Sequence, residues 1–125
     1  MTEQTFYEAI GGHDTIKKVV DRFYEGVATD ALLQPMYPEE DLGPAAHRFT
    51  MFLEQYWGGP TTYSEQRGHP RLRMRHAPFA VTPEARGRWL LHFRAGLDSV
   101  ALPAELDDKF WTYVQNAALS MVNSE

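Results

Sequence analysis

The chain has 125 residues, a formal net charge of −5 at pH 7 and no cysteine. A chain of this length forms one domain, so residues 1–125 are expected to fold around a single core. The missing cysteines exclude disulfides, cysteine-ligated zinc, iron–sulfur clusters and thiol nucleophiles. The acidic balance argues against nucleic acid as a partner. No apolar run approaches the length of a membrane span, so the sequence predicts a cytoplasmic protein without membrane association.

Helical spacing of apolar residues dominates the chain, and no segment alternates as a strand does. Residues 5–10 are expected to form a short first helix. A clearer amphipathic helix begins at His13 or Asp14, because apolar residues then recur every three or four positions. Those apolar positions are Ile16, Val19, Val20, Phe23, Tyr24 and Val27.

Proline and glycine residues mark the helix ends in the middle of the chain. Prolines break a short irregular stretch near residue 36. The next helix is expected to begin at Pro44, which suits the first helical position, and to end at Gly58-Gly59-Pro60. Residues 60–70 are predicted as a loop. Residues 70–77 can form about two helical turns, which a following proline ends.

Two long helices are predicted in the C-terminal part of the chain. Thr82 is a typical N-cap residue and Pro83 suits the first helical position, so a helix opens there and extends to Val100. Pro103 opens the last helix, whose apolar residues share one face as far as Met121. The predicted fold class is therefore all-α.

His76 stands out by its surroundings. It shares a predicted helix face with Leu72 and precedes Phe79. Four arginines lie close before it in an otherwise acidic chain: Arg67, Arg71, Arg73 and Arg75. Haem needs only one protein ligand, since the porphyrin supplies four nitrogens, and an imidazole with apolar walls and a basic rim suits it. A solvated basic turn with an ordinary surface histidine explains the same residues.

A row of residues on the predicted helix 44–57 suits the same ligand. Ala45, Arg48, Phe49 and Phe52 recur at spacings of three and four, so they line one stripe. Haem along this stripe would contact both rings, Arg48 would reach a propionate, and Ala45 would leave room at the metal. Alternatively, the stripe belongs to a core helix whose arginine extends its charged end into solvent.

Three aromatic residues carry hydrogen-bond donors on apolar rings: Tyr24, Tyr37 and Trp89. Buried O–H and N–H groups need partners, and a partially anionic oxygen on iron would be one. Alternatively, each ring packs in the core and its donor bonds to a backbone carbonyl. The residues alone leave both interpretations open.

The longest recognisable pattern lies between residues 52 and 79. It consists of FLEQYWGGP at residues 52–60, YSE at residues 63–65 and GHPRLRMRHAPF at residues 68–79. This block resembles the group II truncated haemoglobins. Shorter segments look like the same family, among them Phe23-Tyr24, Met36-Tyr37-Pro38-Glu39, Trp89-Leu90 and residues 118–123. The resemblance therefore covers nearly the whole chain.

The resemblance implies a truncated globin fold, a two-over-two helical sandwich that encloses haem b (iron protoporphyrin IX). His76 matches the proximal ligand of the iron, and the three donor-bearing aromatics match the distal hydrogen-bond donors. Ala45, Arg48, Phe52, Tyr63 and Arg75 match positions around the haem, to which the local pattern adds Phe49, Leu72 and Phe79. The Gly11-Gly12 and Gly58-Gly59 pairs match the glycine turns of the shortened globin fold.

The function that the resemblance implies is reversible binding of O2 and other small ligands, with slow O2 release because three donors stabilise the bound ligand. Phe49 stands where leucine is more usual, and its bulkier ring would slow ligand entry. Two other functions remain open. One is a peroxidase-like, nitric-oxide- or sulfide-handling redox enzyme that uses the same haem and an external reductase. The other is a haem-free helical interaction module. Assembly into an oligomer is compatible with the sequence.

Overall fold

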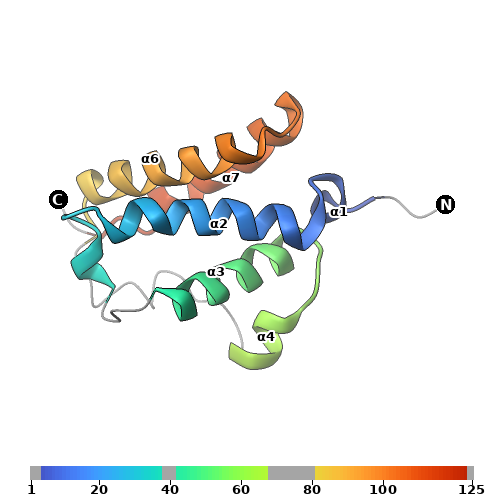
Figure 1. Cartoon of the computed structure of the whole chain (residues 1–125), viewed down its shortest axis with the longest axis horizontal. Coiled ribbons are helices and arrows are strands. Elements are labelled where there is room, and N and C mark those ends of the chain that lie inside the picture. Colours follow the sequence, from blue (N-terminus) through green and yellow to red (C-terminus); the bar gives the residue numbers. More distant parts are fainter. Residues whose placement is uncertain (1–3, 38–41, 68–80, 124–125) are drawn as a thin grey trace.

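The computed structural model describes residues 4–37, 42–67 and 81–123. Within these ranges every regular element is a helix and no strand occurs, which confirms the predicted all-α class (Figure 1). The elements in chain order are α1 (Phe6–Ala9), α2 (Gly12–Ala28), the short 3-10 helix η1 (Gln34–Met36), α3 (Gly43–Tyr56), α4 (Thr62–Arg67), α6 (Pro83–Val100) and α7 (Ala104–Ser120).

Two helix pairs form the body of the molecule. Helix α2 packs against both α3 and α6, and α6 packs against α7. In Figure 1, α6 and α7 lie on one side of α2, while α3 lies on the other side. The contact between α2 and α6 is the most extensive, because Gly96 lets the helices approach until a Cβ there would collide with the Val19 carbonyl. This arrangement agrees with the expected two helices over two.

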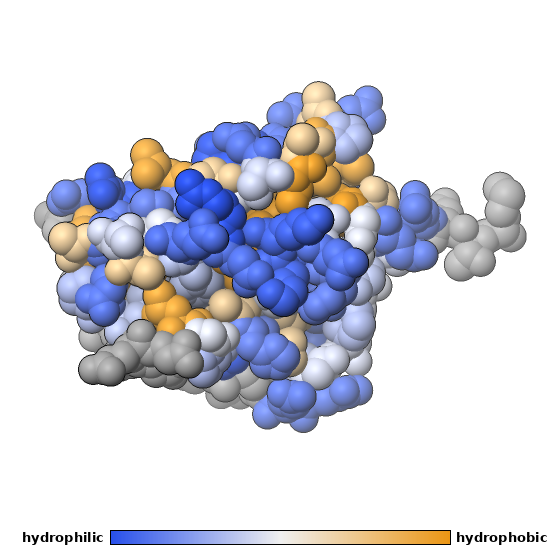
Figure 2. Space-filling view, in the orientation of Figure 1, coloured by the Kyte–Doolittle hydropathy of each residue, from blue (hydrophilic) through white to orange (hydrophobic). Residues whose placement is uncertain are grey.

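The core is centred on α2. All six apolar positions that the spacing predicted for this helix are buried. Burying a side chain of this kind stabilises the fold by about 1.5–3 kcal/mol. The opposite face of α2 carries charged residues, and it forms the hydrophilic band across the middle of Figure 2. The amphipathic pattern therefore fixes which face of α2 meets the other helices.

Turns at both ends of α1 bring three helices together. Thr5 and Glu8 form a reciprocal capping box at the start of α1. Gly11 (φ 108°) and Gly12 (φ 70°) then adopt left-handed backbone, which glycine reaches without steric cost. Buried Glu54 of α3 accepts hydrogen bonds from the Tyr7 hydroxyl (3.4 Å) and from His13 Nδ1 (2.9 Å). The short first helix is thus held against α2 and α3.

The segment after α3 differs from its prediction. The expected loop over residues 60–70 is wrong for its middle part, because Thr62–Arg67 forms helix α4. The Gln55 side chain stabilises this helix from α3: its Oε1 accepts from the Ser64 amide (2.9 Å) and its Nε2 donates to Ser64 Oγ (2.7 Å). The helical turns predicted for residues 70–77 lie outside the described residues.

The start of α6 follows its prediction. Thr82 Oγ accepts a hydrogen bond from the Ala85 amide (3.1 Å), and Pro83 occupies the first helical turn. Just before it, Val81 pairs with Asn123: the Val81 amide donates to Asn123 Oδ1 (2.8 Å) and the Asn123 amide donates to the Val81 carbonyl (2.9 Å). The end of α7 is thereby tied to the start of α6. None of the described helices is long and apolar enough to cross a membrane.

Candidate functional site

Three hydrogen-bonding aromatic residues from three different elements meet between α2 and α6. Tyr24 is buried on α2, Tyr37 follows η1, and Trp89 lies on α6. The rings of Tyr24 and Tyr37 contact each other edge to face, with centroids 5.7 Å apart. The Tyr24 hydroxyl and the Trp89 indole N–H both approach the Tyr37 hydroxyl and lower its pKa as hydrogen-bond donors do. The Tyr37 oxygen is therefore the centre of the cluster.

Burial keeps the Tyr37 hydroxyl protonated. Loss of solvent around the hydroxyl raises the pKa of Tyr37 above its ordinary value, and this outweighs the two donated hydrogen bonds, which act in the opposite direction. Tyr37 is accordingly a phenol at neutral pH. Its oxygen accepts from two neighbours, and neither of these bonds uses its own proton. Among the residues that the structure describes, these two contacts leave that proton for a further acceptor.

Phe49 of α3 forms the wall beside these donors. Its ring lies within 5.7–6.4 Å, centroid to centroid, of four other rings, those of Phe23, Tyr24, Trp89 and Phe93. Trp89 stacks on Phe93 with centroids 5.3 Å apart and planes at 13°. The stacking fixes the plane of the indole, and so the direction in which its N–H points.

The row predicted along α3 extends to α4. Ala45 is buried, and Arg48, Phe49 and Phe52 are partly buried. Phe52 contacts Tyr63 of α4 edge to face, with centroids 5.6 Å apart, and Tyr63 is only 5% exposed. The structure thus brings together the row on α3 and Tyr63.

The other predicted site residues lie outside the described part of the chain. These are the predicted proximal ligand and three of its neighbours: His76, Leu72, Arg75 and Phe79. Their assignment stays a prediction.

The described residues fit haem as a prosthetic group. A porphyrin packs against flat apolar walls, and a hydrogen-bond donor in a pocket without water stabilises a polar ligand on its iron. Phe49 and Phe52 supply the wall, and the protonated Tyr37 hydroxyl, which accepts two hydrogen bonds, supplies the donor. The donor set is therefore of the kind that stabilises a partially anionic ligand.

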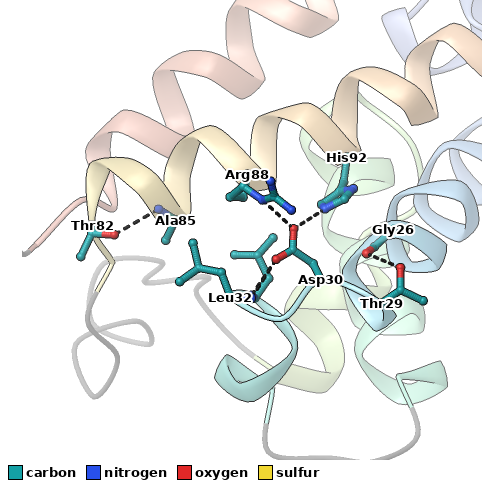
Figure 3. A network of polar contacts seen from close by, with 9 residues as sticks. Gly26, Thr29, Asp30, Leu32, Thr82, Ala85, Arg88 and His92 are labelled. Carbon is teal, nitrogen blue, oxygen red and sulfur yellow. Dashed lines mark hydrogen bonds and ion pairs between the residues drawn. The ribbon is translucent and has the colours of Figure 1, made fainter.

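One polar cluster beside these aromatics was not predicted from the sequence. The Asp30 side chain is 1% exposed, and its Oδ2 accepts from Arg88 Nε (2.9 Å) and His92 Nε2 (2.7 Å) of α6 (Figure 3). Its Oδ1 accepts from the amides of Leu32 (2.9 Å) and Leu33 (3.3 Å). The hydrogen bond from His92 is the largest of the contributions that hold the pKa of Asp30 far below its ordinary value, against the effect of burial.

A local signal for Asp30 exists, but it indicates only half of the cluster. Aspartate often accepts a hydrogen bond from the amide two residues later and so starts a turn. Arg88 and His92 are 58 and 62 residues away along the chain. No spacing rule connects groups at that separation.

The chain and its fold match those of known proteins. The family model for bacterial-like globins matches residues 5–123. A Bacillus subtilis protein, group 2 truncated hemoglobin YjbI, is 42% identical over 117 residues, covering 94% of this chain and 87% of its own. The thermostable hemoglobin of Thermobifida fusca superposes with a TM-score of 0.94 at 61% identity, covering 96% of this chain and 98% of its own. The truncated oxygen-avid haemoglobin of Bacillus subtilis gives a TM-score of 0.90 at 41% identity, with 96% and 100% covered.

Proposed function

The chain belongs to the bacterial-like globins, as a group II truncated haemoglobin with the two-over-two fold, and from this premise we propose that it binds O2 tightly and releases it slowly. As a globin it binds haem, and with it O2 and other small ligands. One structural neighbour is described as oxygen-avid. The observation that carries the proposal for this chain is the Tyr37 hydroxyl, which accepts two hydrogen bonds and keeps its own proton.

The haem is proposed to be haem b, with His76 as the proximal ligand. Covalent attachment in the manner of c-type haem needs cysteines, and the chain has none. The group is then held by ligation through His76 Nε2, by the aromatic wall on α3, and by cationic and phenolic side chains at its propionates. The residues proposed for the propionates are Arg48, Tyr63 and Arg75. When bound, ferrous haem supplies an iron atom with one open position for O2.

Tyr37 is proposed as the direct donor to O2 in the pocket, with Tyr24 and Trp89 acting through it. A hydroxyl that accepts two hydrogen bonds is polarised, so its own proton becomes a stronger donor. One such bond to a partially charged acceptor contributes about 1.5–3 kcal/mol. Since ~1.4 kcal/mol changes a rate about tenfold, this bond alone slows O2 release by on the order of ten- to a hundredfold.

The first test is the absorption spectrum of the purified protein in its oxidised, reduced and O2-exposed forms. A Soret band with a five-coordinate ferrous form and a stable O2-exposed spectrum is expected. In His76→Ala the five-coordinate ferrous spectrum should be lost. A His76→Ala protein with a Soret band and axial ligation unchanged from the parent would remove His76 as the proximal ligand.

The second test measures O2 dissociation by stopped flow. Tyr37→Phe keeps the ring and removes only the hydroxyl, so we expect release about tenfold faster or more. Trp89→Phe should accelerate release less, since it removes one donor to Tyr37 rather than the donor to O2. Tyr56→Phe is the matched control, because Tyr56 lies at the far end of α3 and is 51% exposed. Equal rates in Tyr37→Phe and the parent would contradict the proposed donor.

A further inference from the structure

Asp30 occupies the junction between two parts of the distal cluster. It follows the C-terminus of α2, which carries Tyr24, and precedes the turn and the helix η1 that lead to Tyr37. Its side chain is almost completely buried although it is charged. A buried carboxylate is costly unless each oxygen is hydrogen-bonded, so the partners of Asp30 indicate what holds it there.

The two carboxylate oxygens bond in different directions. Oδ1 accepts from the Leu32 and Leu33 amides, and the Asp30 carbonyl accepts from the Gln34 amide (2.9 Å), so the turn before η1 is organised around this residue. Oδ2 accepts only from side chains of α6 in the described structure (Figure 3). One side chain therefore links the turn that leads to Tyr37 with the helix that carries Trp89.

The contacts on α6 flank Trp89 in sequence. Arg88 directly precedes it, and His92 follows three positions later, almost one helical turn away. The His92 ring also lies against the backbone of α2, where a Cβ on Gly26 would overlap its Nδ1 edge. His92 thus sits between α2, α6 and the Asp30 turn, and it is only 13% exposed.

We propose that Asp30 is a positioning residue that holds the Tyr37 turn against α6, so that the Trp89 indole reaches the Tyr37 hydroxyl. The proposal rests on the proposed donor role of Tyr37. A hydrogen bond weakens steeply outside its distance and angle range, so a small shift of the turn relative to α6 would break the bond from Trp89. As a positioning residue, Asp30 touches neither the ligand nor the haem and acts only through Tyr37 and Trp89.

The test is a double-mutant cycle on O2 dissociation from the holoprotein. Asp30→Asn keeps the shape of the side chain and one acceptor oxygen. It removes the negative charge that Arg88 and His92 of α6 contact. It should accelerate release on the order of fivefold in the parent and leave the rate unchanged in Tyr37→Phe, because coupled residues are not additive. Asp98→Asn removes an exposed carboxylate that pairs with Arg94 on α6 and serves as the matched control. It should leave the rate unchanged.

A second readout does not depend on ligand release. Hydrogen exchange of the Trp89 indole N–H, followed by NMR on the holoprotein, reports whether its bond to Tyr37 persists. We expect faster exchange in Asp30→Asn and no change in Asp98→Asn. If Asp30→Asn does not yield folded holoprotein, Arg88→Gln replaces it. Arg88 is half exposed, and this substitution removes only one of the two contacts between Asp30 and α6. The same direction of change is expected there, with smaller size.

The outcomes separate this proposal from the proposed function. If Tyr37→Phe accelerates release but Asp30→Asn changes neither the rate nor the Trp89 exchange, positioning by Asp30 is wrong and the donor role stands. Equal acceleration by Asp30→Asn with and without Tyr37 would also overturn it, because the effect would then be general destabilisation. If Tyr37→Phe leaves release unchanged, the donor role fails, and the Trp89 exchange alone decides whether Asp30 holds the turn.

Discussion

Two glycine-to-alanine substitutions should have opposite effects on stability. Gly26 lies inside α2 without unusual backbone, so helix propensity alone predicts that alanine would stabilise the fold by about 1 kcal/mol. The added Cβ, however, would overlap the His92 ring. The ring can move only by giving up the 2.7 Å bond from its Nε2 to buried Asp30. Overpacking costs about 1–3 kcal/mol and the loss of a hydrogen bond to a charged group about 1.5–3 kcal/mol. Against the propensity gain of about 1 kcal/mol, we therefore expect a net loss of roughly 3 kcal/mol.

Gly87→Ala is the matched comparison. Gly87 lies inside α6, and a Cβ there would meet nothing within 4 Å, so the propensity gain of up to ~1 kcal/mol should appear undiminished. Urea unfolding of the ferric holoprotein at pH 7, followed by circular dichroism, gives both free energies. A Gly26→Ala protein as stable as the parent, or more stable, would refute the argument. In an Asp30→Asn background the cost of Gly26→Ala should shrink, because the bond to Asp30 is already altered.

Three further predictions concern the same core. The folded-state pKa of Asp30 is depressed, so its stabilisation is present above about pH 4 and is lost as the pH falls further. Urea unfolding from pH 7 to pH 3 should therefore show that, below pH 4, the free energy of unfolding falls more steeply in the parent than in Asp30→Asn. The difference in slope should be up to about 1.4 kcal/mol per pH unit, and parallel profiles would disprove this. Phe49→Leu should accelerate CO rebinding after flash photolysis, because it removes a ring that packs against Trp89; an unchanged rate would show that Phe49 does not restrict entry. Thr82→Ala removes the N-cap of α6 and should cost about 1 kcal/mol in the same urea assay, and a cost near zero would mean that the bond to Ala85 contributes nothing.

The long helices could be predicted from the sequence because their signals are local. The spacing of apolar residues identified the buried face of α2, and Thr82-Pro83 marked the start of α6. Helix α4 could not be found in this way, since its six residues are too few to form a helix without outside contacts. What stabilises it is Gln55 of α3, whose side chain bonds to Ser64 in both directions. A residue on another helix decided this local structure.

In the candidate site too, the residues could be predicted from the sequence but their contacts could not. The resemblance named Tyr24, Tyr37 and Trp89, and the structure places them in one cluster. Sequence alone left open whether each donor bonds to the backbone or to a ligand. In the structure neither alternative describes all three residues, because Tyr24 and Trp89 act as donors to Tyr37. This arrangement depends on how α2, the turn before Tyr37 and α6 are placed in space, which no spacing within one element encodes.

The buried carboxylate of Asp30 is better explained by the orientation that its hydrogen bonds fix than by the stability that they add. A buried ion pair often contributes little net stability, because desolvation offsets its attraction, and an apolar side chain of similar size can do as well. An apolar side chain at position 30 could fill the space between the turn and α6, but it would fix no orientation. The carboxylate instead fixes two directions at once, toward the Leu32 amide and toward the His92 ring. A hydrogen-bonded cluster such as that of Tyr37 tolerates small errors in angle poorly. The directional hydrogen bonds of Asp30 can therefore hold this cluster in the required geometry, which a stronger but non-directional apolar contact would not do.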